Sequence, residues 1–114
     1  MSHNRFQFIG NLTRDADLRQ IENTTNCRAT INLAVNRPKR PGDTPSVDYF
    51  RIKCFNALAE NAAKYLGKGS EVFIEGRIEQ TKYQKDADTK PEYGIDFIAE
   101  KIEYLNTKKP AASQ

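Results

Sequence analysis

The sequence predicts an all-β protein: a small five-stranded barrel with a single α-helix between two of its strands. About half of the 114 residues belong to segments in which apolar and polar side chains alternate, which is the period of a β-strand. One segment, 57–66, shows helical spacing instead. This is too little helix to cover a parallel α/β sheet, so a barrel is favoured.

Six alternating segments are expected to form strands. They span residues 5–12, 18–21, 27–36, 47–55, 72–83 and 92–104. The short segment 18–21 lies between two polar turns and is expected to pair in a hairpin. The other five segments are longer and are expected to form the barrel.

Residues 57–66 are predicted to form the helix because they are rich in helix formers and repeat their apolar residues at helical spacing. Gly67 stands where a glycine commonly ends a helix. A helix between the third long strand and the next strand is the arrangement of the OB fold, a Greek-key barrel. Residues 1–106 are therefore expected to form one OB-fold domain.

Three segments are expected to lie outside regular structure. Residues 37–46 hold three prolines and one glycine, which predicts an exposed basic loop. Residues 85–91 are expected to form the charged tip of a hairpin. Residues 107–114 are mostly polar and lie beyond the barrel pattern, so they are expected to form a short disordered tail.

Composition constrains function only loosely. The net charge of +3 is compatible with a polyanionic partner but does not require one. The sequence has neither a run of about 18 apolar residues nor an N-terminal secretory signal, so a cytoplasmic protein is expected. Cys27 and Cys54 are expected to be buried thiols, with a disulfide as the alternative. Because His3 is the only histidine, we expect no catalytic triad, metal site or cofactor.

The strand 47–55 carries the clearest functional signal. Its even-numbered residues are largely apolar and are expected to face the core. Its odd-numbered residues alternate aromatic rings with cations, as Tyr49, Arg51, Lys53 and Phe55. Exposed rings stack on unpaired bases and nearby cations bind phosphates, so this face predicts a surface for single-stranded nucleic acid. The alternative is that the two rings pack beneath a loop or at a subunit interface.

Neighbouring segments supply further candidate contacts. They are Arg28, Arg37, Lys39, Arg40, Arg77 and Tyr83. The cations of loop 37–46 suit a flexible arm that closes on a nucleic-acid backbone, and a solvated loop is the alternative. Arg77 and Tyr83 share their face of strand 72–83 with two glutamates, which are unfavourable beside phosphates. Contact there is expected to be discontinuous, or part of the strand to face another subunit.

Several blocks at matched spacing resemble the bacterial and phage single-stranded DNA-binding proteins. The blocks are residues 10–15 (GNLTRD), 18–19 (LR), 31–38 (INLAVNRP), 59–66 (AENAAKYL), 68–70 (KGS) and 72–77 (VFIEGR). The resemblance runs in order from about residue 4 to residue 105. It implies an OB fold, a homotetramer and sequence-tolerant binding of single-stranded DNA in replication, repair and recombination, without catalysis. An apolar edge at Phe6, Phe8 and Ile9 is expected to contribute to the assembly.

The resemblance also implies roles for single residues. It places stacking positions on Tyr49, Phe55 and Tyr83, where family members often have tryptophan at the first and last. A further stacking position falls near Lys39, where this sequence has no aromatic residue. Long family members end in an acidic tip that recruits replication and repair proteins. This sequence ends without one, as expected of a short paralogue, a plasmid or phage version, or a trimmed chain.

Two other functions remain as alternatives. An RNA-binding OB module would use the same exposed rings. An interaction protein on the same scaffold would bind other proteins through its sheet. The preference between DNA and RNA strands of equal sequence separates the first alternative, and salt-dependent binding of oligo-dT separates the second.

Overall fold

The computed structural model describes residues 1–83, 90 and 92–110. Of the hairpin tip expected at 85–91, only Lys90 is among the described residues. Residues 111–114 of the expected tail and the side chain of Tyr83 also lie outside the described part.

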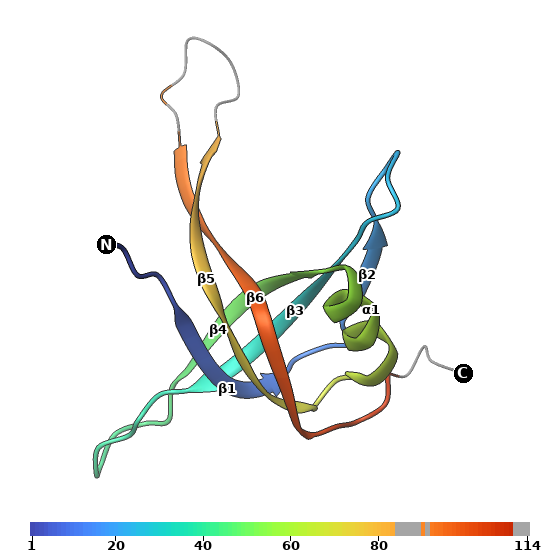
Figure 1. The fold of residues 1–114 in the computed structure, drawn as a ribbon. Helices are drawn as coiled ribbons and strands as arrows, with labels where there is room; N and C mark the ends of the chain where they lie inside the picture. The colour runs from blue at the N-terminus through green and yellow to red at the C-terminus, as the bar shows by residue number, and fades with distance from the viewer. Residues whose placement is uncertain (84–89, 91, 111–114) are drawn as a thin grey trace.

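Five strands close into a barrel (Figure 1). They are β1 (Phe6–Leu12), β3 (Cys27–Asn36), β4 (Val47–Phe55), β5 (Glu71–Tyr83) and β6 (Glu92–Asn106). Neighbouring strands follow the order β1-β5-β6-β4-β3, and β3 returns to β1 through the pairs Asn11–Ala34 and Leu12–Leu33. The β4–β6 pairing is parallel, and the others around the barrel are antiparallel. The predicted five-stranded OB barrel is confirmed.

Two smaller elements complete the fold. Within the described part of the chain, β2 (Asp17–Gln20) pairs with β3 alone and forms the predicted hairpin outside the barrel. α1 (Asn56–Tyr65) lies between β4 and β5, as predicted, and packs against β3 and β4. Three hairpins, β2–β3, β3–β4 and β5–β6, project from the barrel in different directions (Figure 1).

Gly67 does not end the helix in the predicted way. The C-cap residue is Leu66, whose backbone is extended, and Gly67 is not among the glycines with positive φ. The chain at Lys109 and Pro110 instead crosses Gly67 so closely that a Cβ would lie 2.5 Å from the Lys109 carbonyl oxygen. The prediction of Gly67 as the C-cap glycine is therefore wrong, and glycine is needed here for close backbone approach.

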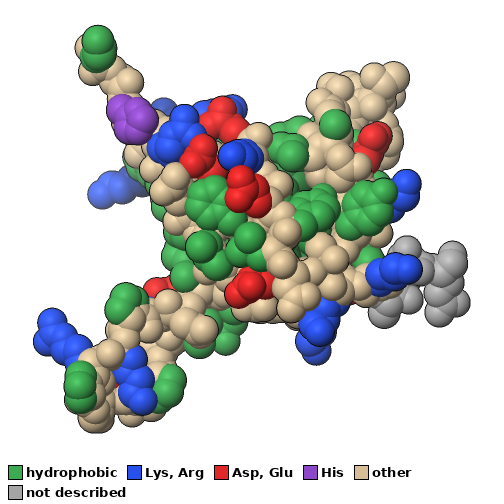
Figure 2. Space-filling model, turned by 60° about the horizontal axis from the view of Figure 1, so that its bottom comes forward, with side chains coloured by type: hydrophobic (Ala, Val, Ile, Leu, Met, Phe, Trp, Pro, Cys, Tyr) green, Lys and Arg blue, Asp and Glu red, His purple; other side chains and the backbone are tan. Residues whose placement is uncertain are grey.

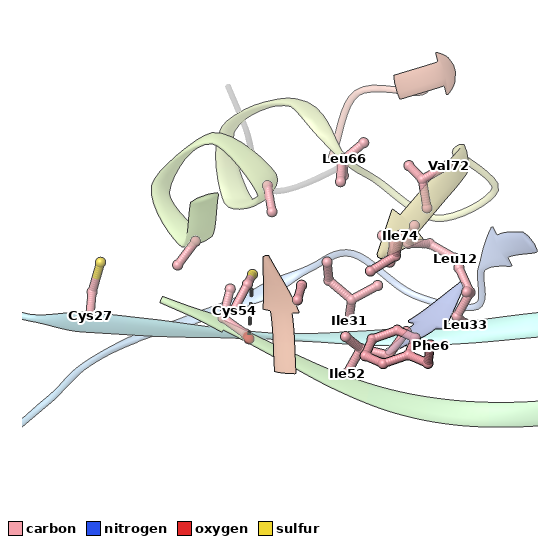
Figure 3. Packing of buried hydrophobic residues seen from close by; sticks show 14 residues of the cluster. Phe6, Leu12, Cys27, Ile31, Leu33, Ile52, Cys54, Leu66, Val72 and Ile74 are labelled. Carbon is pink, nitrogen blue, oxygen red and sulfur yellow. Dashed lines mark hydrogen bonds between the residues drawn. The ribbon is translucent and has the colours of Figure 1, made fainter. Parts of the chain in front are cut away.

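The core fills the inside of the barrel beneath the helix (Figure 3). Its largest fully buried side chains include Ile31, Leu33 and Ile52. Cys27 and Cys54 are both buried and free, as expected of thiols rather than a disulfide. The regular alternation of β3 and β4 places these residues inside because successive side chains of a strand point to opposite faces.

The rings near the N-terminus belong to this core. Phe8 stacks on Phe50 with ring centroids 4.2 Å apart, and Phe6 meets Phe97 edge-on at 5.3 Å. The expected apolar edge is therefore wrong for Phe6 and Phe8, which are used inside the barrel. Only Ile9 of that set is exposed, at 56%.

The chain after β6 packs against the loop that follows α1. The Lys108 carbonyl oxygen accepts hydrogen bonds from the Gly67 N–H at 2.6 Å and the Ser70 hydroxyl at 3.0 Å. The Lys108 N–H donates in turn to the Ser70 hydroxyl oxygen at 2.9 Å. Ser70 is fully buried, and Pro110 is buried as well. Residues 107–110, which we call the C-terminal strap, thus lie against the barrel, while a domain boundary after residue 106 remains a prediction.

Candidate nucleic-acid interface

β4 presents the two faces that its sequence predicts. Ile52 and Cys54 are fully buried, and Phe50 packs against the core. On the opposite face, Tyr49 is 72% exposed and Phe55 is 37% exposed. Within the described part of the chain, no loop therefore covers the Tyr49 ring.

The register between β3 and β4 extends this face sideways. Ala34 pairs with Tyr49, and Arg28 pairs with Phe55. Directly paired residues of antiparallel strands project from the same side of a sheet. The small Ala34 side chain leaves the Tyr49 ring open, and the Arg28 cation lies next to the Phe55 ring. A ring and a cation are thus neighbours across the strands as well as along β4.

Three of the predicted cations already have carboxylate partners. The closest pairs are Lys53–Asp96 at 3.0 Å, Arg37–Asp48 at 2.8 Å and Arg77–Glu79 at 2.7 Å. Hydrogen bonds from Arg37 lower the pKa of Asp48, and the same contact raises the pKa of Arg37. Arg28 and Arg51, by contrast, form no ion pair within the described residues. Their charge is the more available to an external anion.

Lys39 and Arg40 lie on the β3–β4 loop, which projects from the barrel and carries basic side chains (Figures 1 and 2). Both are exposed, and neither forms an ion pair with any residue that the structure describes. The loop is closed at its base by a hydrogen bond from the Arg37 N–H to the Ser46 carbonyl oxygen at 3.0 Å. The predicted exposed basic loop is confirmed.

Tyr83 ends β5 on the hairpin that β5 forms with β6. This hairpin extends away from the barrel (Figure 1). The backbone of Tyr83 pairs with Glu92 at the outer end of the hairpin. The predicted stacking position therefore belongs to an arm rather than to the barrel wall.

A polar groove beside Tyr49 was not anticipated from the sequence. It consists of two hollows of about 390 and 280 Å³ that share Arg14, Asn32 and Arg51. Tyr49 borders the first hollow, and Asp17 borders the second. Arg14 follows β1 in a polar turn that reads as an ordinary solvated loop. The only sequence signal for it is a cation in a turn, and that signal has no fixed spacing to β4.

These features define a class of protein. An OB barrel with exposed rings and arginines on its outer face is typical of oligonucleotide-binding proteins. The described residues contain no group of three or more metal-ligating side chains that could hold an ion. They also contain no helix that is long and apolar enough to cross a membrane.

The chain belongs to the single-strand binding protein family, whose model matches residues 3–105. It is 34% identical to single-stranded DNA-binding protein 1 of Clostridium acetobutylicum over 109 residues, which cover 95% of this chain and 98% of that protein. A single-stranded DNA-binding protein of Oceanobacillus iheyensis is 37% identical over 112 residues, 97% of this chain and 68% of the relative. Single-stranded DNA-binding protein 1 of Staphylococcus aureus strain Mu50 is 35% identical over 113 residues, with 97% and 70% covered. The resemblance seen in the sequence is confirmed.

Proposed function

We propose that this protein binds single-stranded DNA on the outer face of β3 and β4, without strong sequence preference and without catalysis. The observation that carries the proposal is the exposed Tyr49 ring beside a groove lined by Arg14 and Arg51. Every base has a face that can stack on such a ring, at roughly 1–3 kcal/mol per base, so stacking tolerates any sequence. Arginines supply the phosphate contacts, which carry no sequence information.

The family supports DNA as the ligand, since the relatives are named as single-stranded DNA-binding proteins. The proposed role is to cover and protect single strands that replication, repair and recombination expose. Such a role places the protein at the nucleoid in the cytoplasm. Replication and repair proteins that meet the same strands are its proposed partners.

We also propose that the protein acts as a homotetramer. Ile9 is exposed, and its register partner in β5, Phe73, lies beside it on the outer face of β1 and β5. Figure 2 shows a face on which hydrophobic side chains gather between acidic and basic ones. Burying exposed apolar side chains between copies would stabilise a small barrel. Sedimentation at micromolar concentration should give four times the chain mass, and a monomer would contradict this proposal.

Equilibrium titration with oligo-dT, monitored by tyrosine fluorescence, tests the function. We expect saturable quenching, affinity that falls as salt rises, and similar affinity for oligo-dC of the same length. A double-stranded DNA of equal length is the control and should bind far more weakly. Tighter binding to an RNA strand of the same sequence would favour the RNA-binding alternative. No salt-dependent binding at all would favour the protein-binding alternative.

A further inference from the structure

We propose that Arg14 is a further DNA-contacting residue, and that Arg14 and Arg51 together clamp one phosphate of the bound strand in the groove beside Tyr49. This inference rests on the proposed function. It adds a loop residue to an interface that the sequence pattern places on the strands.

The loop that carries Arg14 is held firmly on both sides of that residue. Before it, the Thr13 N–H donates to the Asn32 carbonyl oxygen at 2.8 Å, and the Thr13 hydroxyl donates to the same oxygen at 3.3 Å. After it, the Asp15 carboxylate accepts a hydrogen bond from the Lys68 N–H at 2.8 Å. The Arg14 backbone is thereby fixed, while its exposed side chain lines both hollows of the groove. A fixed backbone lowers the entropy lost when the side chain contacts a ligand.

Asn32 places the two arginines on either side of the groove. β3 is flanked there by the end of β1, through Thr13, and by β4, through the register pair Asn32–Arg51. The neutral Asn32 therefore separates the Arg14 loop from Arg51. Among the described residues, none that lines the hollow shared with Tyr49 carries a carboxylate to compensate the two cations.

The charges of the groove favour an anion. Within the described residues, neither Arg14 nor Arg51 forms an ion pair. The carboxylate at the far end of the groove belongs to Asp17, which already pairs with Arg19 at 3.1 Å. Two guanidinium groups in one hollow repel each other, and an anion between them removes that repulsion. Guanidinium groups also bind phosphate oxygens with two parallel hydrogen bonds, so a phosphodiester fits this pair of residues.

The size and walls of the groove favour a nucleotide over a free anion. The hollow that Arg14, Arg51 and Tyr49 share has a volume of about 390 Å³. Pockets for small organic ligands begin at roughly 300 Å³, so one nucleotide can enter. A base that stacks on Tyr49 leaves its own phosphate within the same hollow. Stacking and phosphate binding then act on a single nucleotide.

The test compares Arg14→Ala with wild type in oligo-dT titrations at several salt concentrations. We expect affinity to fall by about three- to tenfold at low salt, and the slope of log affinity against log salt to become shallower by about 0.7. Arg14→Lys should keep most of the slope because it keeps the charge. Lys64→Ala removes one exposed positive charge from α1, outside the groove lining, and should leave the slope unchanged. The unfolding temperature of Arg14→Ala should equal that of wild type, since no ion pair is lost.

The double variant Arg14→Ala/Arg51→Ala distinguishes a clamp from two separate contacts. If both residues hold one phosphate, the double variant should lose less slope than the sum of the two single variants. Fully additive slopes would overturn the clamp, and an unchanged slope in Arg14→Ala would overturn any contact by Arg14. In both cases, wild-type binding to oligo-dT would leave the proposed function standing. Absence of wild-type binding would refute the proposed function itself.

Discussion

Lys53 donates a hydrogen bond of 3.0 Å from Nζ to Oδ2 of Asp96, at the seam where β4 and β6 run parallel and close the barrel. The two side chains are only 28% and 27% exposed. The alternation of rings and cations along β4 predicts phosphate contacts for Lys53 as well as for Arg51. The structure distinguishes the two cations. The Lys53 ammonium is paired with Asp96, whereas Arg51 forms no ion pair within the described residues.

We therefore expect Arg51→Ala to reduce the salt dependence of oligo-dT binding by about 0.7 in slope, one phosphate's share for a single strand. Lys53→Ala should reduce it less, because Asp96 already compensates the ammonium charge. Lys53→Ala should also lower the free energy of unfolding, since it leaves a half-buried carboxylate without its partner. Salt titrations and urea unfolding of both variants measure these effects. Equal slope changes in the two variants would contradict the distinction.

The exposed rings of β4 should contribute through stacking. Tyr49→Ala and Phe55→Ala should each weaken single-strand binding by roughly 1–3 kcal/mol and leave the salt slope nearly unchanged. Tyr49→Phe keeps the ring and should bind almost as wild type. Phe50→Ala, on the opposite face, should instead destabilise the fold by about 3 kcal/mol because Phe50 stacks on Phe8 in the core. Normal binding by both ring variants would show that the interface lies elsewhere.

The C-terminal strap should contribute to stability but not to DNA binding. Removing residues 107–114 takes away the backbone partners of the buried Ser70 hydroxyl and of the Gly67 N–H. We expect the free energy of unfolding to fall by about 1–3 kcal/mol. Oligo-dT affinity should stay within about twofold, or roughly 0.4 kcal/mol. The matched control ends at Pro110 and retains the strap. Equal free energies of unfolding in urea for the two truncated chains would refute the role of the strap.

Burial raises the pKa of the Cys54 thiol to about 12. In the unfolded chain the pKa of a cysteine thiol is about 8.5. Between that pH and about pH 12, the unfolded chain therefore releases a proton that the folded chain keeps. The free energy of unfolding should therefore fall as pH rises above about 9. Burial also raises the pKa of Tyr104, so part of the decline should persist without Cys54.

Chemical unfolding measured from pH 7 to pH 10.5 tests this relationship. Cys54→Ala should show a shallower decline with pH than wild type, although its stability at neutral pH is lower because a buried side chain is lost. Cys27→Ala leaves Cys54 in place and should keep most of the decline, because burial is the largest cause of the raised Cys54 pKa and the charge interaction with Cys27 contributes less. Identical pH profiles for Cys54→Ala and wild type would rule out Cys54 as the source.

The sequence by itself determined the barrel, the position of the helix and the orientation of the strand side chains. These follow from local periodicity, because side chains alternate along a strand whatever the rest of the chain does. Tyr49 and Phe55 could thus be placed outside, and Ile52 and Cys54 inside, without a structure. The ordered family blocks could likewise be found from spacing alone.

Only the tertiary structure decided which cations have carboxylate partners and where two distant segments of backbone pack closely together. Lys53 pairs with Asp96 of β6, and Arg14 lines the same hollow as Arg51. The members of each pair lie far apart in the sequence, so no local pattern indicates that they are neighbours. Gly67 is required by a strap that returns from the other end of the chain. Electrostatic pairing and close backbone contact depend on distance in space, and that distance is set only when the barrel closes.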